Sequence, residues 1–248
     1  MKYILKLQLG SRVFAPSWFS VVLTALLLPG LLSLGFWQLR RAQEKRDLMA
    51  QAEQGRQQTL SYATATASLF ARYQHVSANG HYDPTHQVLL DNMPSAAGQP
   101  GYRVLTPLRL DDGGVLLVDR GWLAAGTDRD HLPDVAVATD LRRVAGILDE
   151  LPRPGVRAGD AGIATGQWPQ RLNYPTYAEL QALYGAGLQP RILLLDATES
   201  AGYERHWLID VGFTPERHVA YAVQWFGLAA TLLVIFVVVN LRRLPPAA

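Results

Sequence analysis

The chain has 248 residues, of which 49% are hydrophobic and only 18% are charged, and its formal net charge is +2. A charge this small, without a long basic run, excludes a nucleic-acid-binding protein. The absence of cysteine excludes disulfides, covalent c-type haem attachment, thioredoxin-like chemistry and thiolate metal sites.

The first predicted element is a membrane-spanning helix over residues 17–39, a stretch without charged side chains. About 20 apolar residues cross a bilayer core of about 30 Å, so this stretch is long enough. Trp18 and Trp37 lie about 28 Å apart on a helical rise, a spacing typical of two interfacial anchors, and Pro29 with Gly30 predicts a kink between them. A cleaved signal peptide is the alternative, but its apolar region is shorter and a small-residue cleavage site follows it, whereas WQLRRAQEKR follows here.

Residues 40–217 form the next predicted domain, which is large enough for one hydrophobic core. The helical pattern continues to about Gln54, and beyond it short segments between turns predict strands. These strands are Tyr73–Ala78, Gln87–Asp91, Arg103–Leu110, Gly114–Asp119, Arg143–Leu148, Arg191–Asp196 and Trp207–Val211. The segment Asp111–Gly114 predicts a hairpin turn, Leu151–Pro169 a long loop, and Thr176–Tyr184 a short helix.

The second span is predicted over residues 218–241, and its start carries three helix signals. Thr214 can cap the helix, Pro215 suits its first position, and Glu216 favours its first turn. The whole pattern predicts an α+β membrane protein, in which two transmembrane helices flank a mostly antiparallel β-sheet or partial barrel with one or two short helices.

The two tails, residues 1–16 and 242–248, are predicted to lie in the cytoplasm. Two spans place both ends on one side of the membrane, and the pair Arg242-Arg243 beside the short carboxyl tail favours the inside. A segment as long as the one between the spans crosses the membrane largely regardless of its charge. We therefore expect the large domain outside the cytoplasm.

No enzyme motif is found in the sequence: G-x-S-x-G, H-E-x-x-H, a phosphate-binding glycine loop and a dinucleotide fingerprint are all missing. The pair Asp111-Asp112 falls on a solvated hairpin tip, and Asp119-Arg120 is typical of an ion pair at a strand end. We therefore expect a protein that is not an enzyme. Three histidines close in the chain offer imidazole ligands for a metal ion, although exposed loop histidines are the simpler interpretation: His75, His81 and His86.

His218 is the histidine with the most informative surroundings. It lies in the first turn of the second span, and helical spacing places Tyr221, Ala222 and Trp225 on its face. A histidine beside aromatic rings and a small residue suits a flat apolar ligand, and histidine commonly ligates haem iron. An interfacial belt of His, Tyr and Trp without a ligand is the alternative. Trp37 and Gln38 lie at the same level on the first span, where a polar side chain is expected to hydrogen-bond across the helices.

Four segments, in order along nearly the whole chain, carry a family resemblance. They are GFWQLRRAQEKRDL from Gly35, the strand and turn Val76–Asp83, the block Gly101–Pro107 with Val115–Trp122, and HVAYAVQWFGLA from His218. These segments resemble the surfeit-locus family of cytochrome c oxidase assembly factors. Two positions depart from the family pattern: Asp119 stands where Asn often precedes Arg-Gly-Trp, and Ala42 stands where an aromatic residue often occurs.

The resemblance implies a role in building the haem-copper oxidase. Its members are thought to receive haem a (heme a) transiently, or to assist its insertion into subunit I of cytochrome c oxidase. The family's histidine maps onto His218 as an axial ligand of the haem iron, and Trp37, Gln38, Tyr221 and Trp225 match motif positions around it.

The implied partners are oxidase subunit I, other oxidase assembly factors and the lipid bilayer. The implied location is the bacterial inner membrane, with the large domain in the periplasm. Arg120, Gly121 and Trp122 are expected to dock on the oxidase or to cap the seam between the helices. The alternative function is a scaffold that stabilises subunit I without carrying haem. A sensor is disfavoured by the short tails, and a copper chaperone by the lack of cysteine.

Overall fold

The computed structural model describes residues 7–9, 12–95, 97–126, 131–154, 159, 161–163, 166–207 and 212–243. The chain divides into two compact units. The helix unit comprises Met1–Met49 and Asp210–Ala248, and the barrel unit comprises Ala50–Ile209. The predicted boundaries at 17–39 and 218–241 concern the membrane itself and stay a prediction.

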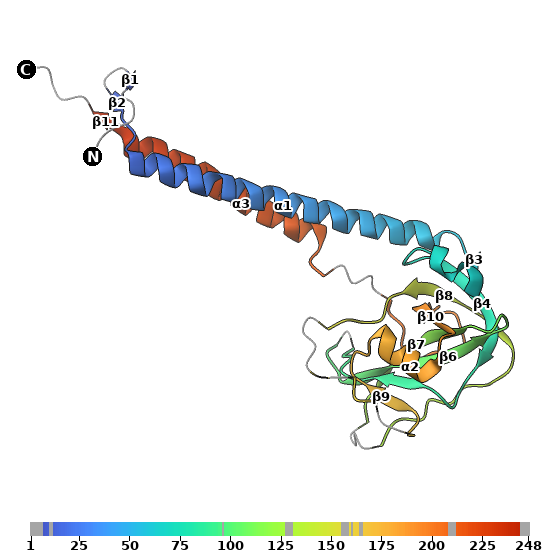
Figure 1. Ribbon diagram of the computed structural model, residues 1–248. Coiled ribbons are helices and arrows are strands. Elements are labelled where there is room, and N and C mark those ends of the chain that lie inside the picture. The colour runs from blue at the N-terminus through green and yellow to red at the C-terminus, as the bar shows by residue number, and fades with distance from the viewer. Residues whose placement is uncertain are drawn as a thin grey trace, which may run out of the picture. The chain divides into compact units, whose positions relative to one another are not determined.

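Two long helices make up most of the helix unit. Helix α1 (Trp18–Arg56) continues unbroken through Pro29, and its last residues belong to the barrel unit. Helix α3 (Pro215–Asn240) begins as the sequence predicts, because the Thr214 side chain accepts a hydrogen bond from the Arg217 amide and Pro215 occupies the first turn. Both helices are long and apolar enough to cross a membrane, and they run side by side (Figure 1).

A small three-stranded sheet, which the sequence did not predict, joins the N-terminal end of α1 to the C-terminal end of α3. It consists of β1 (Leu7–Leu9), β2 (Arg12–Phe14) and β11 (Leu241–Arg243), with β2 in the centre and both pairings antiparallel. Beside it, the buried Asn240 side chain accepts hydrogen bonds from the Ser17 amide at 3.2 Å and the Ser20 hydroxyl at 3.0 Å.

The barrel unit is built around a closed ring of five strands (Figure 1). The ring runs β4 (His75–Tyr82), β8 (Arg142–Asp149), β10 (Leu188–Leu195), β7 (Val115–Ala124) and β6 (Gly101–Leu110), and β6 pairs back to β4. The β7–β10 pairing is parallel and the other four are antiparallel. The predicted fold class, two helices flanking a mostly antiparallel partial barrel, is therefore confirmed.

Short elements complete the barrel unit. Strand β3 (Leu60–Ser61) pairs with β4, and strands β5 (Val88–Leu90) and β9 (Gln170–Leu172) extend the sheet beyond β6. A 3-10 helix, η1, covers Thr64–Leu69, and α2 (Tyr177–Tyr184) packs against β10. The Thr176 hydroxyl and the Glu179 carboxylate form a capping box that starts α2, as expected for these residue types.

The interior of the ring is apolar and fully covered. Because successive strand residues point to opposite faces, alternate residues such as Leu116 and Val118 of β7 face inward. There they meet residues from the four other strands of the ring. The buried cluster consists of Tyr62, Ala67, Val76, Ala78, Tyr82, Leu108, Leu110, Leu116, Val118, Val144, Leu148, Leu193 and Leu195. Burial of each large side chain contributes about 1.5–3 kcal/mol, so this cluster is the main source of stability in the unit.

The predicted strands agree with the structure in six of seven cases, with end shifts of a few residues. The seventh, Trp207–Val211, falls mostly outside the described residues, and Trp207 itself belongs to no strand. The segment Asp111–Gly114 does turn β6 into β7, and the described part of Leu151–Pro169 contains neither helix nor strand.

Candidate functional site

Small residues line the contact between α1 and α3 in the helix unit. Gly35 and Ala42 of α1 and Ala222 and Ala229 of α3 are buried. A Cβ atom placed on Gly35 would lie 2.5 Å from the ring of Phe226. Small residues let transmembrane helices approach, because the lipid offers no hydrophobic driving force between them.

His218 and Gln38 join the two helices within this seam. The His218 side chain is buried, and its Nδ1 lies 2.7 Å from Oε1 of Gln38. The cross-helix hydrogen bond that Gln38 was expected to make therefore reaches His218. Gln224, another polar residue near this level, is exposed.

The partner of Nδ1 fixes how the imidazole ring can be used. An amide oxygen only accepts hydrogen bonds, so Nδ1 of His218 must carry the hydrogen. In the neutral ring, Nε2 then presents its lone pair. No described residue donates a hydrogen bond to Nε2 of His218. This atom is also not one of the fully buried polar atoms without a hydrogen-bond partner. The nitrogen that points away from Gln38 is therefore available to an incoming electrophile such as a metal centre.

The aromatic residues predicted around His218 are partly exposed in the structure. Trp37 is 43% exposed and Tyr221 37% exposed, while Trp225 is half-buried. Phe213, which the sequence analysis did not single out, has its ring centre 6.1 Å from that of His218. Its position directly before the Thr214 cap was the signal that could have drawn attention to it. The seam therefore offers aromatic surface next to a nitrogen ligand.

Arg120 lies inside the barrel unit. Its guanidinium donates to the carbonyl oxygens of Ala201 at 2.6 Å, Val135 at 2.9 Å and Ala136 at 3.1 Å, and to Oε1 of Gln87 at 3.1 Å. It also stacks over the Tyr203 ring at 4.9 Å. Burial lowers the pKa of Arg120, and the neighbouring tyrosines oppose this shift. Its charge therefore fastens two chain segments onto β7.

Gly121 and Trp122 also hold the segment around Glu204 against β7, through contacts of the backbone. Gly121 has a φ of +113°, and a Cβ there would lie 2.6 Å from the carbonyl of Glu204, so only glycine fits comfortably. The Trp122 amide donates to the Glu204 carbonyl at 2.7 Å, and the indole Nε1 donates to the Met93 carbonyl at 2.7 Å. The Trp122 side chain is half-buried. The predicted docking role of this segment stays a prediction.

Adjacent residues on β7 face opposite sides of the strand, which separates Asp119 from Arg120. Asp119 is fully buried; it pairs with Arg103 and accepts from the Gly121 amide at 3.0 Å. Burial raises the pKa of Asp119, and Arg103 opposes that shift. Asp119 therefore helps to hold the irregular stretch of β7 at Gly121 in place.

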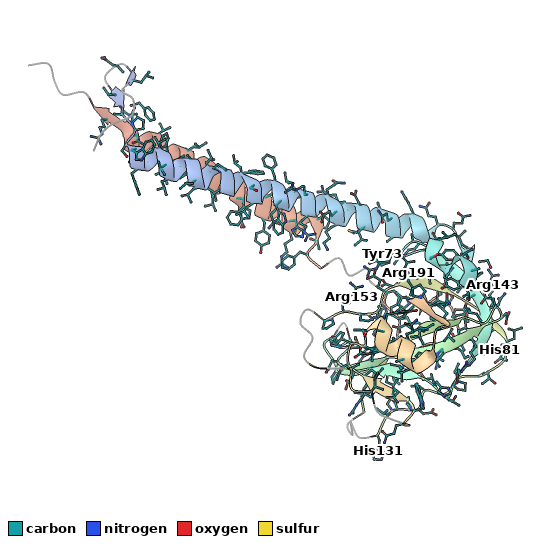
Figure 2. The ribbon with its side chains drawn as sticks, in the orientation of Figure 1. Tyr73, His81, His131, Arg143, Arg153 and Arg191 are labelled. Atoms are coloured by element: carbon teal, nitrogen blue, oxygen red, sulfur yellow. The ribbon has the colours of Figure 1, made fainter. Side chains whose placement is uncertain are left out.

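The three histidines considered for a metal site have other surroundings. His75 Nδ1 lies 2.7 Å from the Thr59 hydroxyl and Nε2 lies 2.8 Å from Asp196, while His86 lies 2.8 Å from Asp83. His81 projects from the barrel surface (Figure 2). Within the described part of the chain, no three His, Asp or Glu side chains gather closely enough to hold a metal ion.

A hollow of about 750 Å³ lies on the surface of the barrel unit, and Arg153 and Arg191 contribute to its lining. Both arginines lie on the same side of the barrel (Figure 2). Arg191 donates to the Phe70 carbonyl, and Arg153 pairs with Glu150 at 3.1 Å. Arg191 is held by the backbone, and the lining of the hollow does not select one kind of ligand, so we do not assign a ligand to it.

Comparison with known proteins identifies a family whose sequence pattern covers most of the chain, including the residues of the seam. A sequence model of the SURF1 family matches residues 25–230, which include most of both helices and the whole barrel unit. The chain belongs to the SURF1 family. Members of this family are generally cytochrome oxidase assembly factors and are not enzymes.

Individual relatives match at low identity over most of their length. A SURF1-like protein of Rickettsia bellii is 26% identical over 214 residues, covering 83% of this chain and 84% of the relative. A SURF1-like protein of Rickettsia felis is 26% identical over 216 residues, covering 84% and 91%. One from Rickettsia conorii is 24% identical over 225 residues, covering 86% and 87%. The match therefore includes the helix unit as well as the barrel unit.

Proposed function

We propose that this chain assists the delivery of haem a to subunit I of cytochrome c oxidase, with His218 as an axial ligand of the haem iron during transfer. The observation that carries this proposal is the bond from His218 to Gln38, which directs the ring and leaves Nε2 available. Histidine ligands of metals usually donate their second nitrogen to a fixed acceptor, which sets tautomer and orientation. Gln38 supplies that acceptor here, so it acts as a positioning residue.

The surroundings of His218 suit the rest of the cargo. Trp37, Tyr221 and Trp225 supply aromatic surface for a flat apolar ring. Helices that span the membrane would leave the long hydrocarbon tail of haem a in the lipid. A single protein ligand binds haem weakly compared with two, which favours release to an acceptor protein over permanent storage.

The proposed setting is the bacterial inner membrane, with the chain crossing it twice and the barrel unit in the periplasm. The two long apolar helices support the two crossings, and the pair Arg242-Arg243 after α3 supports the orientation. We extend the proposal to docking of the barrel unit on the oxidase or on another assembly factor through Arg120, Gly121 and Trp122. On this view Arg120 acts indirectly, by holding the segments around Val135 and Ala201 in place.

The test is the absorption spectrum of protein purified in mild detergent from cells that make haem a. We expect wild-type protein to carry a Soret band and His218→Ala to lose most of it. His81→Ala removes an exposed histidine of the barrel unit and should leave the band unchanged. Equal haem content in the wild type and His218→Ala would overturn the ligand role.

A scaffold function without haem is the second candidate. It is favoured by the burial of His218, which is only 8% exposed, because a buried His–Gln bond also serves simply to join two helices. On this alternative, subunit I co-purifies equally with wild type and His218→Ala, and neither preparation shows a Soret band. Measuring subunit I and haem in the same preparations separates the two functions.

A further inference from the structure

One flank of the helix pair carries an aromatic and a cationic side chain on each helix, and the spatial order of the two is the same on both helices. On α1, Arg41 follows Trp37 by four residues, and on α3, Arg217 precedes Tyr221 by four residues. Residues four apart lie on one face of a helix, one turn from each other. Because α1 and α3 run in opposite directions, each arginine lies beyond its aromatic partner toward the same end of the pair.

Helical rotation places these four residues on the same side of the seam. With about 100° per residue, Trp37 and Arg41 lie about 60–100° to one side of Gln38, and Tyr221 and Arg217 lie about 60–100° to one side of His218. In an antiparallel pair, the same sense of rotation on each helix leads to the same flank. The contact between Gly35 and the Phe226 ring lies on the opposite flank.

The arginines are held beside the aromatic surface. The guanidinium of Arg41 stacks over the Trp37 ring at 5.8 Å, and that of Arg217 stacks over the Phe213 ring at 4.7 Å. Phe213 in turn lies beside His218. Arg41 also pairs with Glu44 at 2.7 Å, but both side chains are about half exposed. A pair of this kind contributes little energy, so a second carboxylate can replace Glu44 readily.

We propose that Arg41 and Arg217 bind the two propionate carboxylates of haem. This inference rests on the proposed function and extends it. Haem is a flat apolar ring with both carboxylates on one edge, and the flank pairs apolar aromatic surface with two cations at one end. A guanidinium matches a carboxylate with two parallel hydrogen bonds. The arginines therefore set the direction in which the ring enters the seam, with its carboxylate edge toward the first turn of α3.

The experiment compares two probes that differ only in these carboxylates. Full-length protein, purified without haem, is titrated with hemin and with hemin dimethyl ester, and binding is followed by the Soret shift. We expect the wild type to bind hemin about 10–100-fold more tightly than the ester, from two charge-assisted interactions. The double variant Arg41→Gln/Arg217→Gln should lose that preference and retain the shifted spectrum of the bound ester.

The matched control removes the same charge from another part of α1. Arg46 and Arg56 are exposed; Arg46 lies about 80° to the other side of Gln38, and Arg56 lies about four turns beyond Arg41 on α1. Arg46→Gln/Arg56→Gln should therefore keep the preference for hemin. A wild type that does not distinguish the probes, or a control that loses as much as the double variant, overturns the inference. His218→Ala, titrated alongside, tests the proposed function separately: an unchanged Soret shift in that variant overturns the ligation itself.

Discussion

Arg120 is a buried charged residue that holds distant segments of the barrel unit together. It is 4% exposed, and its donors reach carbonyl groups on two segments that are distant in sequence, around Val135 and Ala201. A buried cation is tolerated only when hydrogen bonds replace its water. Here backbone oxygens and Gln87 replace it, so the same contacts that satisfy the charge also hold the chain in place.

Replacement of Arg120 by alanine should therefore destabilise the barrel unit. The substitution leaves carbonyl oxygens without donors and opens a cavity beside Tyr203, at a cost of about 3 kcal/mol. For a unit of this size we expect the melting temperature to fall by about 10 °C, measured by thermal unfolding of full-length protein in detergent. Arg153→Ala removes a highly exposed arginine and should change it little. Equal melting temperatures for wild type and Arg120→Ala would contradict this role.

Individual residues differ in how far the sequence could predict them. Thr214 and Pro215 were predictable because a cap and a first-turn proline depend only on neighbours in the chain. The burial of Arg120 was not, because its main partner at Ala201 is 81 positions away. His218 lies between these cases: its level on the helix followed from spacing, whereas its bond to Gln38 required the register of two helices.

At the scale of elements, the seam between α1 and α3 depends on the absence of a side chain at Gly35. Gly35→Leu would force the Phe226 ring to move and push the helices apart, at a cost of about 1–3 kcal/mol. Hydrogen exchange of the α3 peptides around Phe226 should then become about tenfold faster, as measured by mass spectrometry on detergent-solubilised protein.

The control for this substitution lies on the same helix. A Cβ on Gly30 would meet nothing within 4 Å, so Gly30→Leu should leave exchange in α3 unchanged. The packing argument would be wrong if both leucine variants exchanged alike.

Elements with strong local patterns were predictable, and the short strands at the ends of α1 and α3 were not. The β6–β7 hairpin was predicted from its turn residues, and α2 was predicted over Thr176–Tyr184. Strands β2 and β11 have three residues each, too few to show any alternation. They are strands only because they lie next to each other.

At the scale of the whole molecule, Gly80 is the residue where the barrel closes. It pairs with β8 at Arg142 and with β6 at Leu110, and a Cβ there would collide with the carbonyl of Arg109. Gly80→Val should therefore open the ring and expose the core, at a cost on the order of 4 kcal/mol or more. Limited proteolysis of membranes should degrade the barrel unit and spare the fragments that contain α1 and α3.

The contrast between the two units makes this result informative. Gly187→Ala places a methyl group at an ordinary contact distance from its neighbour and should leave the digestion pattern unchanged. Loss of the helix fragments along with the barrel fragments in Gly80→Val would show that the units do not fold separately.

The overall plan was predictable from hydropathy, since two uncharged stretches identify the spans and short strands with turns identify a β-domain between them. The strand order was not. The parallel contact between β7 and β10 joins residues about 75 positions apart, and nothing in either strand specifies the other. Closure through Gly80 likewise depends on two partners that meet only in the folded ring.

The pairing of β2 with β11 has a consequence for the order of events during biosynthesis. Strand β2 precedes α1 in the chain, and β11 follows α3, yet Arg12 of β2 lies opposite Arg243 of β11. The small sheet can form only after translation has passed both helices and the barrel between them. A nascent chain that stops before β11 therefore cannot form the hydrogen bonds between β2 and β11.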